Sequence, residues 1–212
     1  MAKLMAGDVK FVDRNGDGVI DTGENTLEKP GDRYIIGNNR PRYTYSFRGD
    51  IDWYGFNLSV FFQGVGHCDW MPPKTCSYFW SLYGFPASSF VPTDFESKTW
   101  TEDNRNSYFP RRRGYETYSN SALGVNTDRY LQNAAYIRLK NITLGYTLPL
   151  KQNKAVEKVR FYLTGENLWY WSPMKKHSKY VDPEVATASS SQDDDCIYPF
   201  SRTVSLGIDI TF

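Results

Sequence analysis

The sequence predicts an all-β fold of antiparallel strands joined by long loops, and three observations support this prediction. Aromatic residues make up 17% of the 212 residues, an excess typical of strands. Apolar and polar residues alternate with a period of two in several separate segments. In the last of these segments the apolar members are Val204, Leu206, Ile208, Ile210 and Phe212. An alternating strand that closes on an aromatic carboxyl terminus is typical of a bacterial outer-membrane barrel.

The expected strands form two hairpins and a final strand, near residues 43–52, 56–64, 137–148, 158–168 and 202–212. Gly55 suits the tight turn of the first hairpin, because glycine accepts a positive φ. The alternation changes phase near Lys140, which indicates a bulge or a strand leaving the bilayer. The segments 65–135 and 169–200 are expected to be long loops, which are unusual inside compact domains but normal on the outer side of membrane barrels.

Short turns and long loops alternate along the chain, as they do in outer-membrane barrels. Five strands cannot close into such a barrel, which needs at least about eight. We therefore expect residues 43–212 to be strands of a larger barrel, and residues 1–42 to be an extracellular segment. Residues 1–6 lack the apolar core of a signal peptide, so we expect the chain to be either cytosolic or without its native N-terminus.

Composition excludes several other classes. The formal net charge of +1 gives no electrostatic case for nucleic-acid binding. No nucleophile motif, phosphate-binding loop or zinc pattern stands out, so we expect no enzymatic activity. Cys68, Cys76 and Cys196 match no zinc spacing, and the sequence leaves open whether Cys68 and Cys76 are bridged or all three thiols are free.

Residues 13–24 match the calcium-loop pattern D-x-[DN]-x-[DN]-G-x5-E without mismatch. Oxygen ligands at alternating positions suit Ca²⁺, and Gly18 permits the sharp turn inside the loop. The alternative is a solvated turn whose side chains cap their own backbone. No helix pattern flanks the loop, which argues for a structural role. The predicted ligands are Asp13, Asn15, Asp17, the Val19 carbonyl, Asp21 and Glu24.

Seven segments together resemble one family, the SusC/RagA-like TonB-dependent outer-membrane importers of Bacteroidetes. The most recognisable is the strand Y-I-R-L-K-N-I-T-L-G-Y at 136–146. The resemblance covers nearly the whole chain but only the C-terminal barrel portion of the family. The segments are residues 8–21, 32–38, 58–66, 100–111, 136–146, 164–168 and 181–185.

The resemblance implies import of glycan or peptide fragments through a 22-stranded barrel in the outer membrane. It also implies a SusD-like lipoprotein as a partner, and TonB, which would act through an N-terminal region that this chain does not contain. The sequence departs from the family by an insertion within residues 22–31. For that reason either Glu24 or Asp32 could supply the last ligand of the calcium-like loop.

The first long loop is crowded with aromatic residues, and aromatic faces stack on sugar rings. Trp70, Trp80 and Tyr83 are the candidate substrate contacts. The alternative is that these rings pack against one another or against a protein partner. A second function class also stays open, a soluble, calcium-stabilised β-sandwich that binds carbohydrate. The two classes differ in whether the apolar strand faces point into a core or toward lipid.

Overall fold

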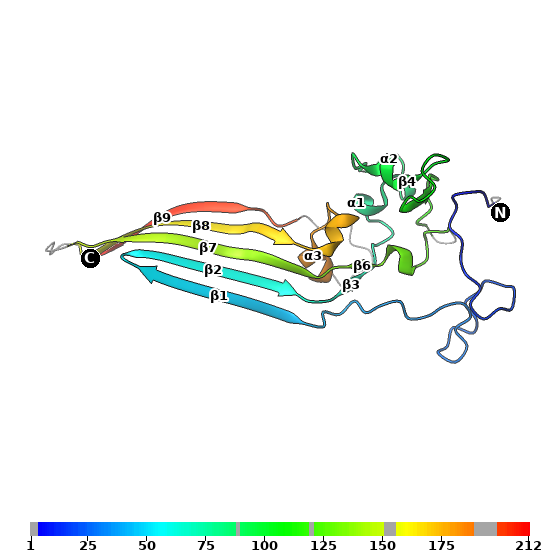
Figure 1. Ribbon diagram of the computed structural model, residues 1–212, viewed down its shortest axis with the longest axis horizontal. Helices are drawn as coiled ribbons and strands as arrows, with labels where there is room; N and C mark the ends of the chain where they lie inside the picture. Colours follow the sequence, from blue (N-terminus) through cyan, green and yellow to red (C-terminus); the bar gives the residue numbers. More distant parts are fainter. Residues whose placement is uncertain (1–3, 88–89, 119–120, 151–155, 189–198) are drawn as a thin grey trace. The chain divides into compact units, whose positions relative to one another are not determined.

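The computed structural model describes residues 4–87, 90–118, 121–150, 156–188 and 199–212. Its main feature is a five-stranded antiparallel sheet with the strand order β1-β2-β7-β8-β9 (Figure 1). The strands are β1 (Thr44–Trp53), β2 (Phe56–Val65), β7 (Tyr136–Leu148), β8 (Lys158–Trp171) and β9 (Thr203–Thr211). All five expected strands are confirmed, and so is the antiparallel all-β class. The described sheet is open, with β1 and β9 at its edges.

The chain divides into two compact units. The sheet unit comprises Asn39–Trp70, Gln132–Ser190 and Ile197–Phe212, and the loop unit comprises Met1–Asn38, Met71–Leu131 and Ser191–Cys196. Short elements of the sheet unit are β3 (Asp69–Trp70), β6 (Gln132–Asn133), η3 (Pro173–Lys176) and α3 (Pro183–Ala188).

The register of the sheet aligns apolar residues into straight rows across all five strands. One row runs Ile51, Leu58, Leu144, Leu163 and Leu206. The adjacent row on the opposite face runs Asp50, Ser59, Thr143, Thr164 and Ser205. Because side chains alternate between the two faces of a strand, this register gives the sheet one apolar face and one polar face.

The turn between β1 and β2 has a positive φ at both central residues, 47° at Tyr54 and 86° at Gly55. Positive φ at both positions is the type I′ geometry, whose twist matches that of the flanking strands. The carbonyl of Gly55 also accepts a hydrogen bond from the Thr147 amide at 2.7 Å, which ties the turn to β7. The expected turn is thus confirmed.

The predicted bulge is also confirmed. The pairing of β7 with β8 shifts between Leu139 and Asn141, leaving Lys140 without a register partner on β8. On β8 the backbone of Asn167 takes a φ of 51°, and the strand then continues to Trp171, beyond the expected end at residue 168. The phase change read from the sequence is therefore an irregularity inside a continuous strand, not the end of one.

The loop unit is folded around aromatic side chains rather than being structureless. Phe79, Trp80, Tyr83, Phe109 and Tyr130 are buried and contact one another ring to ring. The segment expected to be a long loop has only short elements in residues 71–131, but it is ordered, because aromatic rings bury enough area to fix a segment with little regular structure. Its short elements are α1 (Ser77–Trp80), η1 (Ser81–Tyr83), α2 (Phe95–Lys98), β4 (Thr99–Trp100), β5 (Phe109–Arg111) and η2 (Asp128–Tyr130).

Within the described part of the chain, no helix has the length and apolar character needed to cross a membrane.

Candidate functional site

The acidic loop is held by its own side chains. Both carboxylate oxygens of Asp13 accept backbone hydrogen bonds, from Gly16 at 2.6 Å and Gly18 at 2.8 Å. The Asn15 side-chain oxygen accepts from the Asp17 amide, and the Asp17 carboxylate accepts from the Val19 amide. The loop therefore has the capped-turn geometry that the sequence left open as an alternative to metal coordination.

Asp32 closes this loop, whereas Glu24 turns away from it. The Asp32 carboxylate accepts hydrogen bonds from the Arg14 amide at 2.7 Å and the Asp21 amide at 2.9 Å. Glu24 instead forms an exposed ion pair with Lys29 at 2.6 Å. The backbone hydrogen bonds, that from Arg14 foremost, hold the pKa of Asp32 below its ordinary value. The ionised Asp32 carboxylate therefore lies at the loop for which the sequence left Glu24 and Asp32 as alternative last ligands.

No three His, Cys, Asp or Glu side chains among the described residues come together in a way that could hold a metal ion. In this conformation the carboxylates of the predicted ligands Asp13, Asp17 and Asp21 accept hydrogen bonds from backbone amides. The donor set of hard oxygens still suits Ca²⁺, but binding would require these side chains to turn from the amides toward a shared centre.

The apolar face of the sheet carries exposed aliphatic side chains on β1, β7 and β9. Leu206 is 79% exposed, Ile51 is 62% exposed and Leu144 is 50% exposed. A monomeric soluble protein rarely leaves so large a continuous apolar surface in water. Among the described residues no second sheet comparable to this one is present, since the remaining two sheets have two strands each. The face therefore has the character of a surface that meets an apolar medium.

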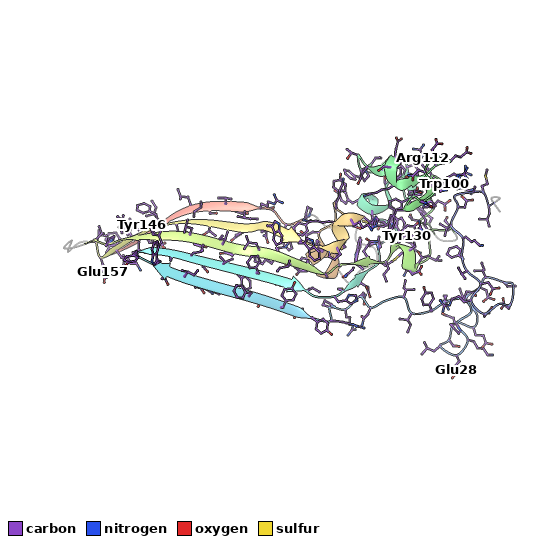
Figure 2. The ribbon with its side chains drawn as sticks, in the orientation of Figure 1. Glu28, Trp100, Arg112, Tyr130, Tyr146 and Glu157 are labelled. Carbon is purple, nitrogen blue, oxygen red and sulfur yellow. The ribbon has the colours of Figure 1, made fainter. Side chains whose placement is uncertain are left out.

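Aromatic side chains border this face at both ends, and aliphatic ones fill the middle. Trp53, Phe56, Tyr146 and Phe161 lie in one register row at the turn end, where Figure 2 labels Tyr146. At the other end Tyr45, Trp169 and Trp171 are also exposed. The nine residues from Tyr45 to Trp53, which are eight steps along β1, span about 27 Å. With a strand tilt of roughly 40°, this gives an apolar band of about 20 Å, close to the roughly 25 Å of membrane barrels.

The polar face carries a ladder of hydrogen bonds close to the turn end. Arg160 on β8 donates to the side chain of Asn57 on β2 at 2.6 Å and pairs with Asp209 on β9 at 3.5 Å. The guanidinium crosses directly over Gly145 of β7, where a Cβ would come within 2.8 Å of the Arg160 Nε. The absence of a side chain at Gly145 lets Arg160 pass over β7 and link β8 with β2 and β9.

Sequence reasoning missed a buried ionic cluster in the sheet unit. Arg138 and Asp182 form an ion pair, and each side chain is 1% exposed. Glu184 adds ion pairs to Arg138 at 2.8 Å and to Lys140 at 2.6 Å. The rings of Tyr170 and Phe200 face the Arg138 guanidinium at 4.8 and 5.1 Å. The signal was present, because Arg138 and Asp182 belong to two of the segments that carry the family resemblance.

This cluster holds the segment after β8 against the first residues of β7. Asp182 also accepts hydrogen bonds from the backbone amides of Glu184 at 3.0 Å and Phe200 at 3.4 Å. The buried Asp182 carboxylate therefore binds both the first turn of α3 and the residues just before β9. Buried charges persist only when they are paired, and the charges of Arg138, Asp182 and Glu184 are paired within this cluster.

The three aromatic residues proposed for substrate contact differ in exposure. Trp80 and Tyr83 are 1% and 0% exposed inside the loop unit. The Trp80 indole donates a hydrogen bond to the Pro73 carbonyl, and the Tyr83 hydroxyl donates one to the Pro110 carbonyl. Trp70 is half-buried in β3 of the sheet unit. The burial of Trp80 and Tyr83 supports the alternative of loop self-packing, and a substrate role for the three stays a prediction.

The cysteines correct one open expectation. Cys68 is a free, buried thiol whose Sγ donates to the Asn39 carbonyl at 3.2 Å. Burial raises the pKa of this thiol. Cys76 is disulfide-bonded whereas Cys68 is free, so both alternatives from the sequence, a Cys68–Cys76 bridge and three free thiols, are wrong. Cys196 lies outside the described residues.

No family model matches the chain. It is 27% identical to TonB-dependent receptor P26 of Formosa agariphila, over 98% of this chain and 20% of that protein. It is 28% identical to TonB-dependent receptor P3 of the same bacterium, over 95% of this chain and 19% of that protein. TonB-dependent receptor SusC of Bacteroides thetaiotaomicron is 25% identical over 95% of the chain and 17% of that protein. The resemblance to SusC-like TonB-dependent receptors is confirmed, and the chain spans about a fifth of the length of these relatives.

Solved structures support the same fold. A structure of the RagAB peptide transporter is similar with a TM-score of 0.60 and 24% identity, covering 85% of this chain and 19% of that chain. The RagAB peptide importer in its open-open state gives a TM-score of 0.59 and 23% identity, covering 87% of this chain and 18% of that chain. At this level of identity the likeness concerns the fold alone.

Proposed function

We propose that the chain is the C-terminal barrel portion of a SusC/RagA-like TonB-dependent transporter in the outer membrane. The observation that carries the proposal is the two-faced sheet, with its exposed aliphatic band bordered by aromatic residues at both ends. The relatives named as TonB-dependent receptors support it independently. In this account the apolar face meets lipid, the polar face lines the interior of a 22-stranded barrel, and strands elsewhere in the same protein pair with the edges of β1 and β9.

The transported material would be glycan or peptide fragments, captured with a SusD-like lipoprotein and released inward by the pull of TonB. The fold does not distinguish between these two substrate classes. No step in this account requires catalysis by the chain.

Fractionation of the bacterium tests the proposal directly. The gene product that carries this sequence is expected in the outer-membrane fraction, heat-modifiable on gels as folded barrels are, and its deletion should abolish uptake of one oligosaccharide or peptide class. Recovery in the soluble fraction without detergent would contradict the proposal and favour the soluble β-sandwich.

We also propose that Ca²⁺ binds the acidic loop through Asp13, Asn15, Asp17, the Val19 carbonyl and Asp21, with Asp32 as the last ligand. The position of Asp32 supports the proposal, because its carboxylate spans the two ends of the loop. The role of the ion would be to fix this loop.

A further inference from the structure

Two exposed cationic side chains lie near each other at the long-loop end of the sheet, where Figure 1 labels α3. They are Lys175 of η3 and Arg202, the residue just before β9, and we call them the cationic pair. Partial burial lowers the pKa of Lys175, and the nearby charges of Arg202 and Arg138 lower it further. Two like charges are therefore held close enough to repel each other.

Lys175 lies on the polar face of the sheet. Its Nζ is 3.7 Å from the centroid of the Tyr170 ring and donates a hydrogen bond to the Tyr170 carbonyl at 2.7 Å. Tyr170 pairs with Arg138 across β7 and β8, and the adjacent pair, Leu139 with Trp169, belongs to the apolar face. Because side chains alternate between the two faces, Tyr170 and the lysine on its ring lie on the polar face.

The residues on both sides hold Arg202 near the same place. β9 begins at the next residue and pairs with β8. On the other side, the Asn167 side chain donates to the Ser201 carbonyl at 3.4 Å, and the Phe200 ring lies 5.1 Å from the Arg138 guanidinium. The backbone around Arg202 is therefore fixed against β8, so the cationic pair is positioned by the fold and not by chance contact of two free side chains.

The carboxylates of the buried ionic cluster do not neutralise the cationic pair. Asp182 and Glu184 are engaged by Arg138 and Lys140, which makes two negative charges for two positive ones. Asp182 raises the pKa of Lys175, but its effect is smaller than those of the two arginines that lower it. Within the described part of the chain, neither member of the cationic pair forms an ion pair with a carboxylate. A surface lined by one sign of charge attracts ligands of the opposite sign.

We propose that the cationic pair binds a carboxylate group of the transported solute. A guanidinium matches both oxygens of a carboxylate through two parallel hydrogen bonds, and an ammonium adds a point charge. The inference rests on the proposed import function, because the polar face lines the passage only when the sheet is part of a barrel. Carboxylates occur on acidic peptides and on oligosaccharides of uronic acids, so this one chemistry serves either class of solute.

The test measures binding to the detergent-solubilised gene product that carries this sequence, by calorimetry at low and high salt. The probes are hexaglutamate and hexagalacturonate, each compared with a neutral counterpart, amidated hexaglutamine and the methyl ester of hexagalacturonate. We expect at least one acidic probe to bind, its neutral counterpart to bind at least about tenfold more weakly, and salt to weaken the acidic probe. Which acidic probe binds distinguishes a peptide from a glycan as the source of the carboxylate.

Lys175→Met and Arg202→Gln should each weaken binding of the acidic probe about tenfold and leave the neutral counterpart unchanged. Arg202→Lys should retain part of the affinity, because it keeps the charge and loses the two-pronged geometry. The matched control is Lys176→Met, which removes the same charge from the neighbouring exposed residue and should change affinity less than about twofold. Thermal unfolding of each variant in detergent verifies that it is folded.

Binding of neither acidic probe, equal binding of acidic and neutral probes, or an equal loss in Lys176→Met and Lys175→Met would overturn the proposal. The last result would show that the net charge of the region, and not a site, attracts the probe. Recovery of the gene product in the outer-membrane fraction, measured separately, reports on the transporter proposal alone, so that either proposal can fail without the other.

Discussion

Among single residues, Asp32 is the one that closes the acidic loop, by accepting hydrogen bonds from the Arg14 and Asp21 amides. The calcium-loop spacing predicts the loop and its oxygen donors, but an insertion within residues 22–31 leaves Glu24 and Asp32 as two candidates for the last position. In the structure the Arg14 and Asp21 amides donate hydrogen bonds to Asp32 and bring it back to the loop, and for this reason we propose Asp32 as the last ligand. The spacing of residues in the sequence does not show that Asp32 folds back onto the loop.

The calcium proposal therefore makes a prediction about two matched variants. Asp32→Asn should weaken Ca²⁺ binding strongly because it removes a negative ligand at the loop closure, and Glu24→Gln should leave affinity nearly unchanged because Glu24 pairs with Lys29. Calorimetric titration of chelator-stripped protein measures both. Absence of any Ca²⁺-dependent heat in the unaltered chain, together with unchanged thermal stability, would contradict the proposal, and so would a larger effect of Glu24→Gln.

The buried ion pair gives a second prediction at this scale. Asp182→Ala leaves the Arg138 guanidinium buried without its main partner, which typically costs about 3–5 kcal/mol of unfolding free energy. Replacing both members, as Arg138→Met with Asp182→Leu, should recover much of that loss because no uncompensated charge remains. Denaturant unfolding in detergent measures the three proteins, and a single variant as stable as the double one would show that the pair is not buried in solution.

At the scale of elements, period-two alternation predicted all five long strands, the tight turn and the bulge. It succeeded because the register of a sheet with one apolar face is strongly constrained. It failed in the loop unit, whose order comes from packing of aromatic rings that are distant in sequence, such as Phe79 with Tyr130. Such contacts leave no local periodicity to detect.

Two glycines of the sheet make a matched test of strand packing. A Cβ at Gly64 would clash with the backbone carbonyl of Tyr136, which cannot move without disturbing β7. A Cβ at Gly207 would meet only the outer atoms of the Tyr162 side chain, which can turn aside. Gly64→Ala should thus cost about 1–3 kcal/mol in unfolding free energy and Gly207→Ala clearly less. Equal losses in denaturant unfolding would contradict the close approach of β2 and β7.

At the scale of the whole molecule, the two-faced sheet predicts an asymmetric response to charge. Lys at Leu206, near the middle of the apolar band, should cost about 2–4 kcal/mol of barrel stability. Lys at Ser205, the adjacent residue on the polar face, should cost less. The readout is the amount of folded gene product in outer-membrane fractions, with Asp at both positions as a second pair. Equal amounts of folded protein for charged substitutions at 205 and 206 would contradict the assignment of the apolar face to lipid and the polar face to the barrel interior.

The most direct measurement of the central claim is the environment of each sheet face in the membrane-embedded protein. Spin labels placed singly at positions 144, 206 and 205 can be probed with oxygen, which concentrates in lipid, and with a water-soluble nickel complex. A lipid-facing sheet should give high oxygen and low nickel accessibility at 144 and 206, and the reverse at 205. Low accessibility to both reagents at 144 and 206 would place the apolar face in a protein core, as in a sandwich, and would contradict a lipid-facing sheet.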